Sequence, residues 1–482
     1  MFKDLLRKKD VASMLRDAEG GGSGLKRSLS ATHLVLLGIG AIVGTGIFVI
    51  TGQAAASYAG PALTISFLIS ALGCVLAGLC YAEFASMIPV SGSVYSYSYA
   101  SIGELLAWFI GWDLVLEYLF ACASVSVGWS GYMVNLLHSF GLDLPPQLLG
   151  STLDHLSSGQ WVLTGNIINF PAVFILGMVT ALLLGGIRQS TLVNNVIVAV
   201  KVGVILLFVG FGLSYIDVGN YTPYLPANTG EFGRYGWSGV LRATGVVFYA
   251  YLGFDALSTT AEEARNPQRD MPKGILISLL ACTLLYVAVT TVLTGMVNYT
   301  ELHVDAPIAL AIDRAGEGLA WLSPLIKLGA VAGLSSVILV MMLGQSRMYY
   351  AIAKDGLLPP RLARLNAKGV PQTAVILSGV ASGIIAGLFP LHVLAELVSI
   401  GTLMAFTIVC LSVLVLRKTQ PGLHRPFRVP HVRLVAVLGA AVCLLQMFSL
   451  PLVTWLRLVA WMAVGLAIYF AYGARRSRLR RP

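Results

Sequence analysis

The nine residues Gly38-Ile39-Gly40-Ala41-Ile42-Val43-Gly44-Thr45-Gly46 decide the fold of this chain. They lie in the apolar range 31–58, and four of the nine are glycine, which costs about 1 kcal/mol relative to alanine in a helix interior. We predict a membrane helix that is interrupted at Gly44-Thr45-Gly46, because non-helical backbone at membrane depth is tolerated only where it is buried or lines a cavity. The second half of that helix begins with free N–H groups, which suit a carboxylate.

Two other structures could use this glycine pattern. Close packing against a neighbouring helix through small residues is an alternative that stays open. A dinucleotide-binding loop of the GxGxxG kind is excluded, because no strand precedes the glycines and no acidic residue follows at the required distance.

The composition around this stretch is that of a membrane protein. Of 482 residues, 57% are apolar and 11% are charged, whereas soluble domains carry about 25% charged residues. A spanning helix needs about 20 apolar residues, and the chain offers twelve such ranges. They are 31–58, 62–87, 102–137, 170–187, 190–216, 239–262, 274–297, 319–350, 372–390, 392–416, 432–450 and 452–472. We therefore predict an all-α polytopic protein with twelve transmembrane helices and no soluble domain.

The basic residues predict the orientation. An even number of spans puts both termini on one side of the membrane, and 26 of the 32 Lys and Arg residues lie in the segments on that side or at the span ends next to them. Because such a bias marks the cytoplasmic side, we predict a multi-pass protein of the cell (inner) membrane with both termini in the cytoplasm. The net charge of +10 is then a signal of topology and not of a nucleic-acid partner.

The two ends of the chain and its cysteines carry no catalytic signal. Residues 1–30 form a cytoplasmic tail whose first part is either an interfacial amphipathic helix or a disordered basic segment, and both readings stay open. Residues 473–482 form a basic cytoplasmic tail. The six cysteines lie in apolar runs without a CxxC pair, so we expect neither a disulfide framework nor a metal site.

A second irregularity occurs in the sixth range, where Gly253-Phe254-Asp255 follows an aromatic run. We predict an unwound segment whose carbonyl groups accept a substrate ammonium. The first and sixth ranges correspond if the chain contains two five-helix repeats, 31–216 and 239–416, followed by two peripheral helices at 432–472. Repeats with an odd number of spans have opposite orientations, and transporters of this kind bind substrate between two broken helices at the midplane.

Ionisable residues inside a membrane are candidates for function. Lys201 lies about eleven residues into the fifth range, too deep for a lysine that reaches the interface. Glu117 lies one helical turn after Asp113. For Glu117 and Asp255, a structural pairing in the core and a contact with the substrate amino group both stay open. Glu83 is expected to act in packing or gating, and Lys327 receives no role.

Two further classes of protein are excluded or disfavoured. Gly128-Trp129-Ser130-Gly131 matches the GxSG of rhomboid-type serine proteases, but all seven histidines lie in loops or at span edges. A serine nucleophile needs a base within hydrogen-bond reach, so we do not expect an enzyme. A channel would need rings of like charge or carbonyl filters from an oligomer that nothing in the sequence specifies.

Several motifs together carry a family resemblance. They are the glycine-rich stretch extended to Phe48, Tyr81-Ala82-Glu83 with Pro89-Val90-Ser91-Gly92-Ser93-Val94-Tyr95, Gly111-Trp112-Asp113-Leu114-Val115-Leu116-Glu117-Tyr118, Gly253-Phe254-Asp255 with Glu262-Glu263-Ala264-Arg265-Asn266-Pro267, and Gly344-Gln345-Ser346-Arg347 with Lys354-Asp355-Gly356. In these residues the chain resembles the amino acid–polyamine–organocation superfamily, and within it the bacterial branch of the cationic amino acid transporter family. The resemblance covers about 30–430. It implies a LeuT-type 5+5 inverted repeat with helices 1 and 6 unwound at mid-membrane, and secondary active import of amino acids.

The resemblance also implies roles for single residues. The substrate carboxylate is assigned to Ile42, Thr45 and Gly46. The amino group and the gate are assigned to Tyr249, Leu252 and Asp255, although Tyr249 stands where relatives often have Phe. The face of the pocket on the third helix is assigned to Glu117 and Ala121.

Energy coupling is implied by Lys201, whose ammonium takes the place of the cation that sodium-driven relatives bind. A lysine that loses and regains its proton would couple uptake to the proton gradient, and no cofactor is needed. Small neutral and cationic L-amino acids both stay open as substrates. The alternative is a proton-independent exchanger of amino acids or polyamines. The sequence does not decide between a homo-oligomer and a small single-span accessory subunit.

Overall fold

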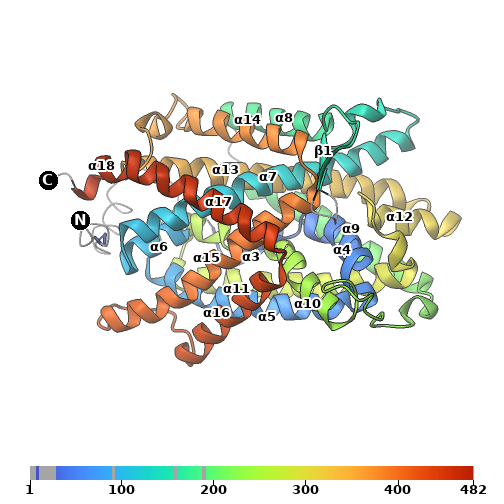
Figure 1. Ribbon diagram of the computed structural model, residues 1–482, viewed down its shortest axis with the longest axis horizontal. Helices are drawn as coiled ribbons and strands as arrows, with labels where there is room; N and C mark the ends of the chain where they lie inside the picture. The colour runs from blue at the N-terminus through green and yellow to red at the C-terminus, as the bar shows by residue number, and fades with distance from the viewer. Residues whose placement is uncertain (1–6, 10–28, 89–92, 156–159, 187–190, 481–482) are drawn as a thin grey trace.

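The computed structural model describes residues 7–9, 29–88, 93–155, 160–186 and 191–480 of the chain. In these ranges the protein is a bundle of apolar helices, most of which run along one long axis (Figure 1). The main helices are α3 (Ala31–Ile42), α5 (Leu63–Met87), α6 (Ser93–Ser101), α7 (Glu104–Ser139), α8 (Phe170–Leu184), α9 (Thr191–Gly212), α10 (Gly236–Val247), α11 (Pro267–Met296), α12 (Pro307–Arg314), α13 (Leu322–Lys354), α14 (Gln372–Leu388), α15 (Leu391–Thr419), α16 (Val432–Ser449) and α17 (Leu452–Ile468). Shorter pieces connect them: α4 (Thr51–Ala54), α18 (Ala474–Arg476), and a hairpin of β1 (Leu153–His155) and β2 (Trp161–Leu163) in a segment expected to be loop.

The helices confirm a polytopic all-α membrane protein. In the described part of the chain, nine helical segments are long and apolar enough to cross a membrane, and α3, α8 and α14 are apolar but shorter. Each of the twelve apolar ranges overlaps at least one of these segments, while the number of crossings stays a prediction. Many of the large exposed side chains on α8, α9 and α16 are apolar, as a surface against lipid requires.

The core is built on long helices that bring distant parts of the sequence together. α7 packs along α13 and α15, and α5 packs along α11, which also contacts α3. Buried aromatic side chains such as Trp108 and Tyr132 donate hydrogen bonds to backbone carbonyls of other segments. Trp108 donates to Gly465 O at 2.9 Å and Tyr132 to Phe48 O at 2.7 Å. Buried aromatic groups of this kind join the outer helices to the centre.

Both described ends of the chain lie at the same end of the bundle. Arg7 donates to the carbonyl of Leu479 at 3.0 Å, and Lys9 pairs with Asp355 at 3.1 Å directly after α13. Residues 7–9 are not helical, and the rest of the segment in which the amphipathic helix was expected lies outside the described residues. We call this the terminal end of the bundle.

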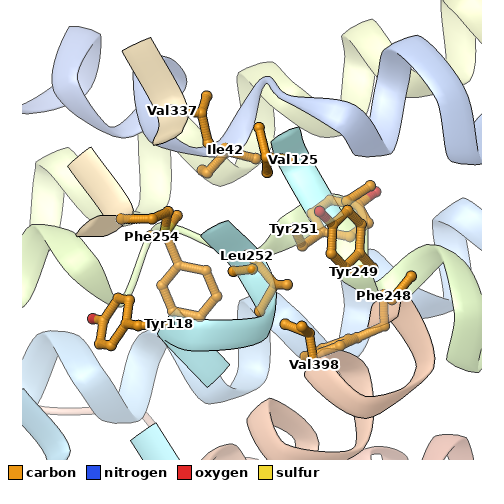
Figure 2. Packing of buried hydrophobic residues seen from close by; sticks show 14 of the residues in the cluster. Ile42, Tyr118, Val125, Phe248, Tyr249, Tyr251, Leu252, Phe254, Val337 and Val398 are labelled. Atoms are coloured by element: carbon orange, nitrogen blue, oxygen red, sulfur yellow. The ribbon is translucent and has the colours of Figure 1, made fainter. Parts of the chain in front are cut away.

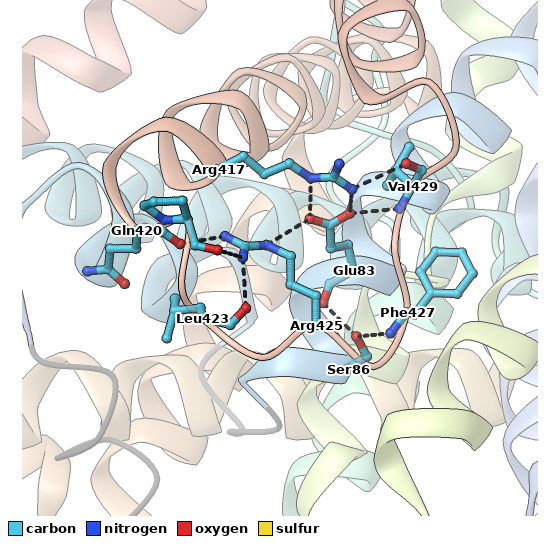
Figure 3. Close-up of polar contacts among 9 residues, drawn as sticks. Glu83, Ser86, Arg417, Gln420, Leu423, Arg425, Phe427 and Val429 are labelled. Atoms are coloured by element: carbon cyan, nitrogen blue, oxygen red, sulfur yellow. Dashed lines mark hydrogen bonds and ion pairs between the residues drawn. The ribbon is translucent and has the colours of Figure 1, made fainter.

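Glu83 ties three segments together at the terminal end (Figure 3). Its side chain is 1% exposed and accepts two bonds from Arg417 of α15, at 2.9 and 2.5 Å. Arg425 lies at 3.6 Å and the amide of Val429 donates at 2.8 Å. The carboxylate therefore joins α5 to α15 and to the loop 420–431, which fits the packing role expected for Glu83, while the gating role stays a prediction.

Two basic residues at the opposite end are also paired. Arg242 of α10 donates to Glu396 of α15 at 2.9 Å, and both side chains are nearly buried. Lys327, to which the sequence assigned no role, donates to Ser139 at 2.9 Å and lies 3.6 Å from Asp313. Lys327 thus joins the ends of α7, α12 and α13.

Replacement of Glu83 tests the tie at the terminal end. Glu83→Ala leaves Arg417 and Arg425 without their carboxylate, and removal of one partner of a buried pair costs about 3–5 kcal/mol. We expect the free energy of unfolding in detergent to fall by that order. Glu231→Ala is the control, because Glu231 pairs with Arg234 at 3.6 Å on an exposed surface and such pairs contribute about 0–1 kcal/mol. Equal losses in the two variants would contradict a structural role for Glu83.

Candidate functional site

The first helix is broken where the glycines predicted it. α3 ends at Ile42, and Val43 follows with extended backbone (φ −72°, ψ 95°) before helix resumes as a π-helix at Gly46–Ile50. Within the described residues, the amides of Gly44, Thr45 and Gly46 donate to no acceptor. The break therefore presents three consecutive buried N–H groups at the start of a helix, which is an arrangement that binds anions.

The sixth apolar range is broken as well. α10 ends at Val247, a 3-10 turn covers Phe248–Tyr251, and a second 3-10 segment begins at Ala256. Between them, Leu252 is extended (ψ 144°) and Gly253 has φ 111°, which favours glycine. In the part of the chain that the structure describes, the carbonyl oxygens of Leu252 and Gly253 accept no hydrogen bond. This break presents acceptors, so the two breaks are complementary to the two ends of a zwitterion.

The glycines of the two breaks bring them into contact. A Cβ atom on Gly46 would overlap the Cα atom of Ala250, and one on Gly253 would lie 2.8 Å from the carbonyl of Ala41. Each glycine thus allows one broken segment to touch the other. Gly46 therefore fits both explanations of the glycine pattern. It packs closely against Ala250, and it lies at the break in the first helix.

Tyr286 of α11 bridges the breaks, and the sequence analysis missed it. Its hydroxyl lies 3.0 Å from Ile42 O and 2.6 Å from Ala250 O. One O–H donates to one carbonyl at a time, so the tyrosine partly satisfies both. Nothing in the sequence distinguishes this tyrosine from the other aromatic residues of apolar helices.

Lys201 lies at the end of α3. It is fully buried on α9, and its ammonium donates to the carbonyls of Gly40 and Val43, the latter at 2.9 Å. A positive charge at a helix C-terminus is favourable. Because α3 ends here, these two carbonyls lack the amide donors that a continuing helix would supply. The lysine stem passes Gly333 of α13, where a Cβ would lie 3.2 Å from it. Lys201 therefore links α9, α3 and α13, and within the described residues it has no acidic partner.

Three buried acids lie in the second break or on α7. Asp255 accepts from the amide of Gly253 at 3.2 Å and from the hydroxyl of Tyr118 at 3.3 Å, so it stabilises the break itself. Glu117 is 3% exposed with one carboxylate oxygen unpaired, and Asp113 has both oxygens unpaired, counted over the described residues. The structural role expected as one alternative fits Asp255. Glu117 remains available to a ligand.

Apolar side chains from five segments surround the breaks. Figure 2 shows Ile42, Val125 and Val337 on one side, with Leu252 and Tyr249 opposite. These residues belong to α3, α7, α13 and the segment after α10, and Val398 of α15 joins them. The hydroxyl of Tyr249 is within 2.7 Å of Ser124 Oγ on α7. Sequence reasoning missed Val125, Val337 and Val398, because buried valines occur throughout such a chain.

The residues assigned by resemblance mostly gather here. Ile42, Thr45, Gly46, Tyr249, Leu252 and Asp255 lie in or beside the two breaks, and Ala121 is buried on α7 one turn before Ser124. The Thr45 hydroxyl is buried without a hydrogen bond to any described residue, next to Gly128 of α7. No assigned residue lies far from the breaks.

The serine of the GxSG motif is hydrogen-bonded to an amide side chain. Ser130 of the GxSG motif donates to Asn169 at 2.7 Å and not to a histidine. Among the described residues, no group of three or more His, Cys, Asp or Glu is arranged to hold a metal ion.

Comparison with known proteins shows the family to which the chain is similar. The profile of a family described as amino acid permease matches residues 29–470. The methylthioribose transporter of Bacillus subtilis (strain 168) is 44% identical over 481 residues, covering 100% of both chains. The branched-chain amino acid permease BcaP of the same strain is 44% identical over 481 residues, covering 99% of this chain and 100% of the relative. The chloroplastic cationic amino acid transporter 9 of Arabidopsis thaliana is 41% identical over 399 residues, 82% of this chain and 67% of the relative.

The contact between the breaks is open to a direct test. Gly46→Ala places a methyl group against the backbone of Ala250, and overpacking of this kind costs about 1–3 kcal/mol. Because the amides of the first break would shift, we expect substrate affinity to fall by about tenfold or more, measured by binding of radiolabelled substrate to purified protein.

The matched control is Gly203→Ala on α9, where a Cβ would meet nothing within 4 Å. This variant should bind substrate as the wild type does. If both variants bind normally, Gly46 has no role in holding the breaks together.

Proposed function

Because the chain belongs to the amino acid permease family of the amino acid–polyamine–organocation superfamily, we propose that it imports a branched aliphatic L-amino acid together with a proton. The family description and the names of the permease and of the amino acid transporter among the relatives all indicate amino acid transport across a membrane. None of these names indicates an enzyme. The substrate class and the proton are the parts that we add.

One observation carries the proposal: the first break offers three free amides and the second two free carbonyls, in contact with each other. An α-amino acid has a carboxylate and an ammonium on neighbouring carbon atoms. The amides of Gly44, Thr45 and Gly46 would bind the carboxylate, with the Thr45 hydroxyl as a further donor. The carbonyls of Leu252 and Gly253 would bind the ammonium. Charge-assisted bonds of this type are stronger than those between neutral groups.

The side chain of the substrate would meet aliphatic groups. Ile42, Val125, Val337 and Val398 are at most 4% exposed and form part of one apolar cluster with Leu252. A branched aliphatic side chain loses no hydrogen bonds in such surroundings, whereas a cationic one would need a carboxylate partner. This favours an apolar substrate, in keeping with the name of the permease BcaP. Glu117 is the residue that a cationic substrate would have to use.

The proton would be carried by Lys201. Its ammonium is held by two carbonyls at the end of α3 and lies against α13. Without its proton the lysine loses its charge, and a lone pair replaces one of its three N–H donors. Its hydrogen bonds to the α3 carbonyls would therefore be weaker. Loss of the proton would thereby release α3 from α9. Binding of the proton on the external side and its release inside would bias the exchange between the two access states.

The proposed architecture follows from the same breaks. We place twelve crossings in the membrane, with ten in a 5+5 inverted repeat of residues 31–216 and 239–416. The breaks lie in the first helix of each repeat, which is how inverted-repeat transporters build a midplane site. The basic residues favour a cytoplasmic position for the terminal end and the cell membrane as the location.

A panel of competitors tests the substrate class. In proteoliposomes, uptake of radiolabelled L-leucine should be saturable and should be inhibited by isoleucine and valine at similar concentrations. Alanine should compete at least about 100-fold more weakly, since it lacks three carbon atoms of the leucine side chain and each lost methylene in an apolar pocket is worth about 1–3 kcal/mol. D-leucine, lysine and polyamines should compete least. Methylthioribose belongs in the panel because of the 44% identical transporter of that name, and its dominance would overturn the amino acid assignment.

A lysine variant tests proton coupling. With the vesicle interior alkaline, the wild type should accumulate substrate above the external concentration, and Lys201→Met should reduce this accumulation at least tenfold. The control is Lys327→Met, the other nearly buried lysine of the described chain, which pairs with Asp313 away from the breaks. Undiminished uphill uptake by Lys201→Met would refute the role of Lys201. Full counterflow by the wild type without a pH gradient, and no accumulation with one, would favour the exchanger.

A further inference from the structure

A groove at the terminal end of the bundle lies apart from the transport site. It has a volume of about 520 Å³ and runs between the first turns of α11 and the loop 420–431. Its basic residues are Arg269 and Lys273, and its apolar wall is formed by Leu276 and Ile277 of α11 with Pro426 and Phe427 of the loop. A groove with two cations at one end and an apolar wall fits an amphipathic anion.

The two basic side chains are free to bind such a ligand. Arg269 and Lys273 are four residues apart on α11, which puts them on one face of the helix, and both are exposed. Within the described residues, neither side chain has a hydrogen bond or an ion pair. By contrast, Arg417 and Arg425 nearby are paired with Glu83. Among the described residues, no acidic side chain pairs with the two cations of the groove.

An apolar stripe continues from the groove along α11. Ile277, Leu280 and Leu284 are 48%, 60% and 64% exposed and follow Lys273 at helical spacing. From Lys273 to Leu284 the helix rises about 16 Å at 1.5 Å per residue, which is close to half of the roughly 30 Å hydrocarbon core of a bilayer. The stripe thus has the length of one lipid leaflet.

We propose that this groove binds an anionic glycerophospholipid, with the headgroup phosphate on Arg269 and Lys273 and an acyl chain along Ile277, Leu280 and Leu284. Basic pockets beside membrane helices bind acidic lipid headgroups by this combination of charge and apolar contact. The apolar stripe distinguishes a lipid from a soluble phosphate, which would contact only the two cations. The proposal does not depend on the transported substrate, and the orientation proposed above puts the groove in the cytoplasmic leaflet.

Native mass spectrometry of the purified full-length chain tests the site. Dioleoyl phosphatidylglycerol and dioleoyl phosphatidylcholine are titrated separately, and glycerol 3-phosphate serves as a headgroup without acyl chains. We expect the wild type to bind phosphatidylglycerol at least tenfold more tightly than phosphatidylcholine, and glycerol 3-phosphate only weakly. The double variant Arg269→Gln/Lys273→Gln should lose about 25-fold in affinity for phosphatidylglycerol, since each basic residue near an anionic surface contributes about fivefold.

The control is Arg361→Gln/Arg364→Gln, two exposed basic residues at the same end but outside the groove. It should bind phosphatidylglycerol within twofold of the wild type, and unchanged thermal unfolding should accompany both double variants because all four side chains are on the surface. Three results would overturn the proposal: equal affinity for the two phospholipids, equal losses in both double variants, or binding of glycerol 3-phosphate as tight as that of phosphatidylglycerol. The last result would make the groove a site for soluble anions.

Discussion

A helix that breaks inside an apolar bundle leaves amide and carbonyl groups that no water satisfies, and the rest of this structure is arranged around that constraint. α3 breaks after Ile42 and α10 breaks after Val247. The carbonyls at the end of α3 are satisfied by the ammonium of Lys201 and the hydroxyl of Tyr286, two side chains from helices far apart in the sequence. The break in α3 is therefore maintained by residues of α9 and α11.

What the protein leaves unsatisfied is as informative as what it satisfies. Donors remain free in one break and acceptors in the other, among the residues that the structure describes. Unpaired backbone groups in a buried site are costly, and a ligand with one carboxylate and one ammonium would satisfy both sets at once. The family description implies an amino acid substrate, and the two sets of unpaired groups suit the two charged ends of such a molecule.

The sequence was informative where local rules are strict. Glycine is enriched where backbone needs special conformations or close approach, so Gly44, Gly46 and Gly253 predicted both breaks. Lysine is rare inside a membrane, so Lys201 stood out. The sequence was silent where partners decide the role. Tyr286, Val125 and Val337 are ordinary residues of apolar helices, and only their neighbours make them part of the site. The hairpin β1–β2 was also missed, since it is three residues long in each strand.

The sequence by itself determined the class of the protein, the two interruptions and the identity of the buried lysine, because apolar run length, glycine content and intramembrane charge are properties of short segments. Only the tertiary structure decided the partners. Lys201 binds the end of α3, and Glu83 joins α5 to α15 through Arg417. Asp255 accepts a hydrogen bond from the amide of Gly253 in its own break and does not pair with a basic side chain of the described residues. The physical reason is that an ion pair or a hydrogen bond depends on which segments are adjacent in space, and adjacency in a bundle is set by the packing of all its helices together.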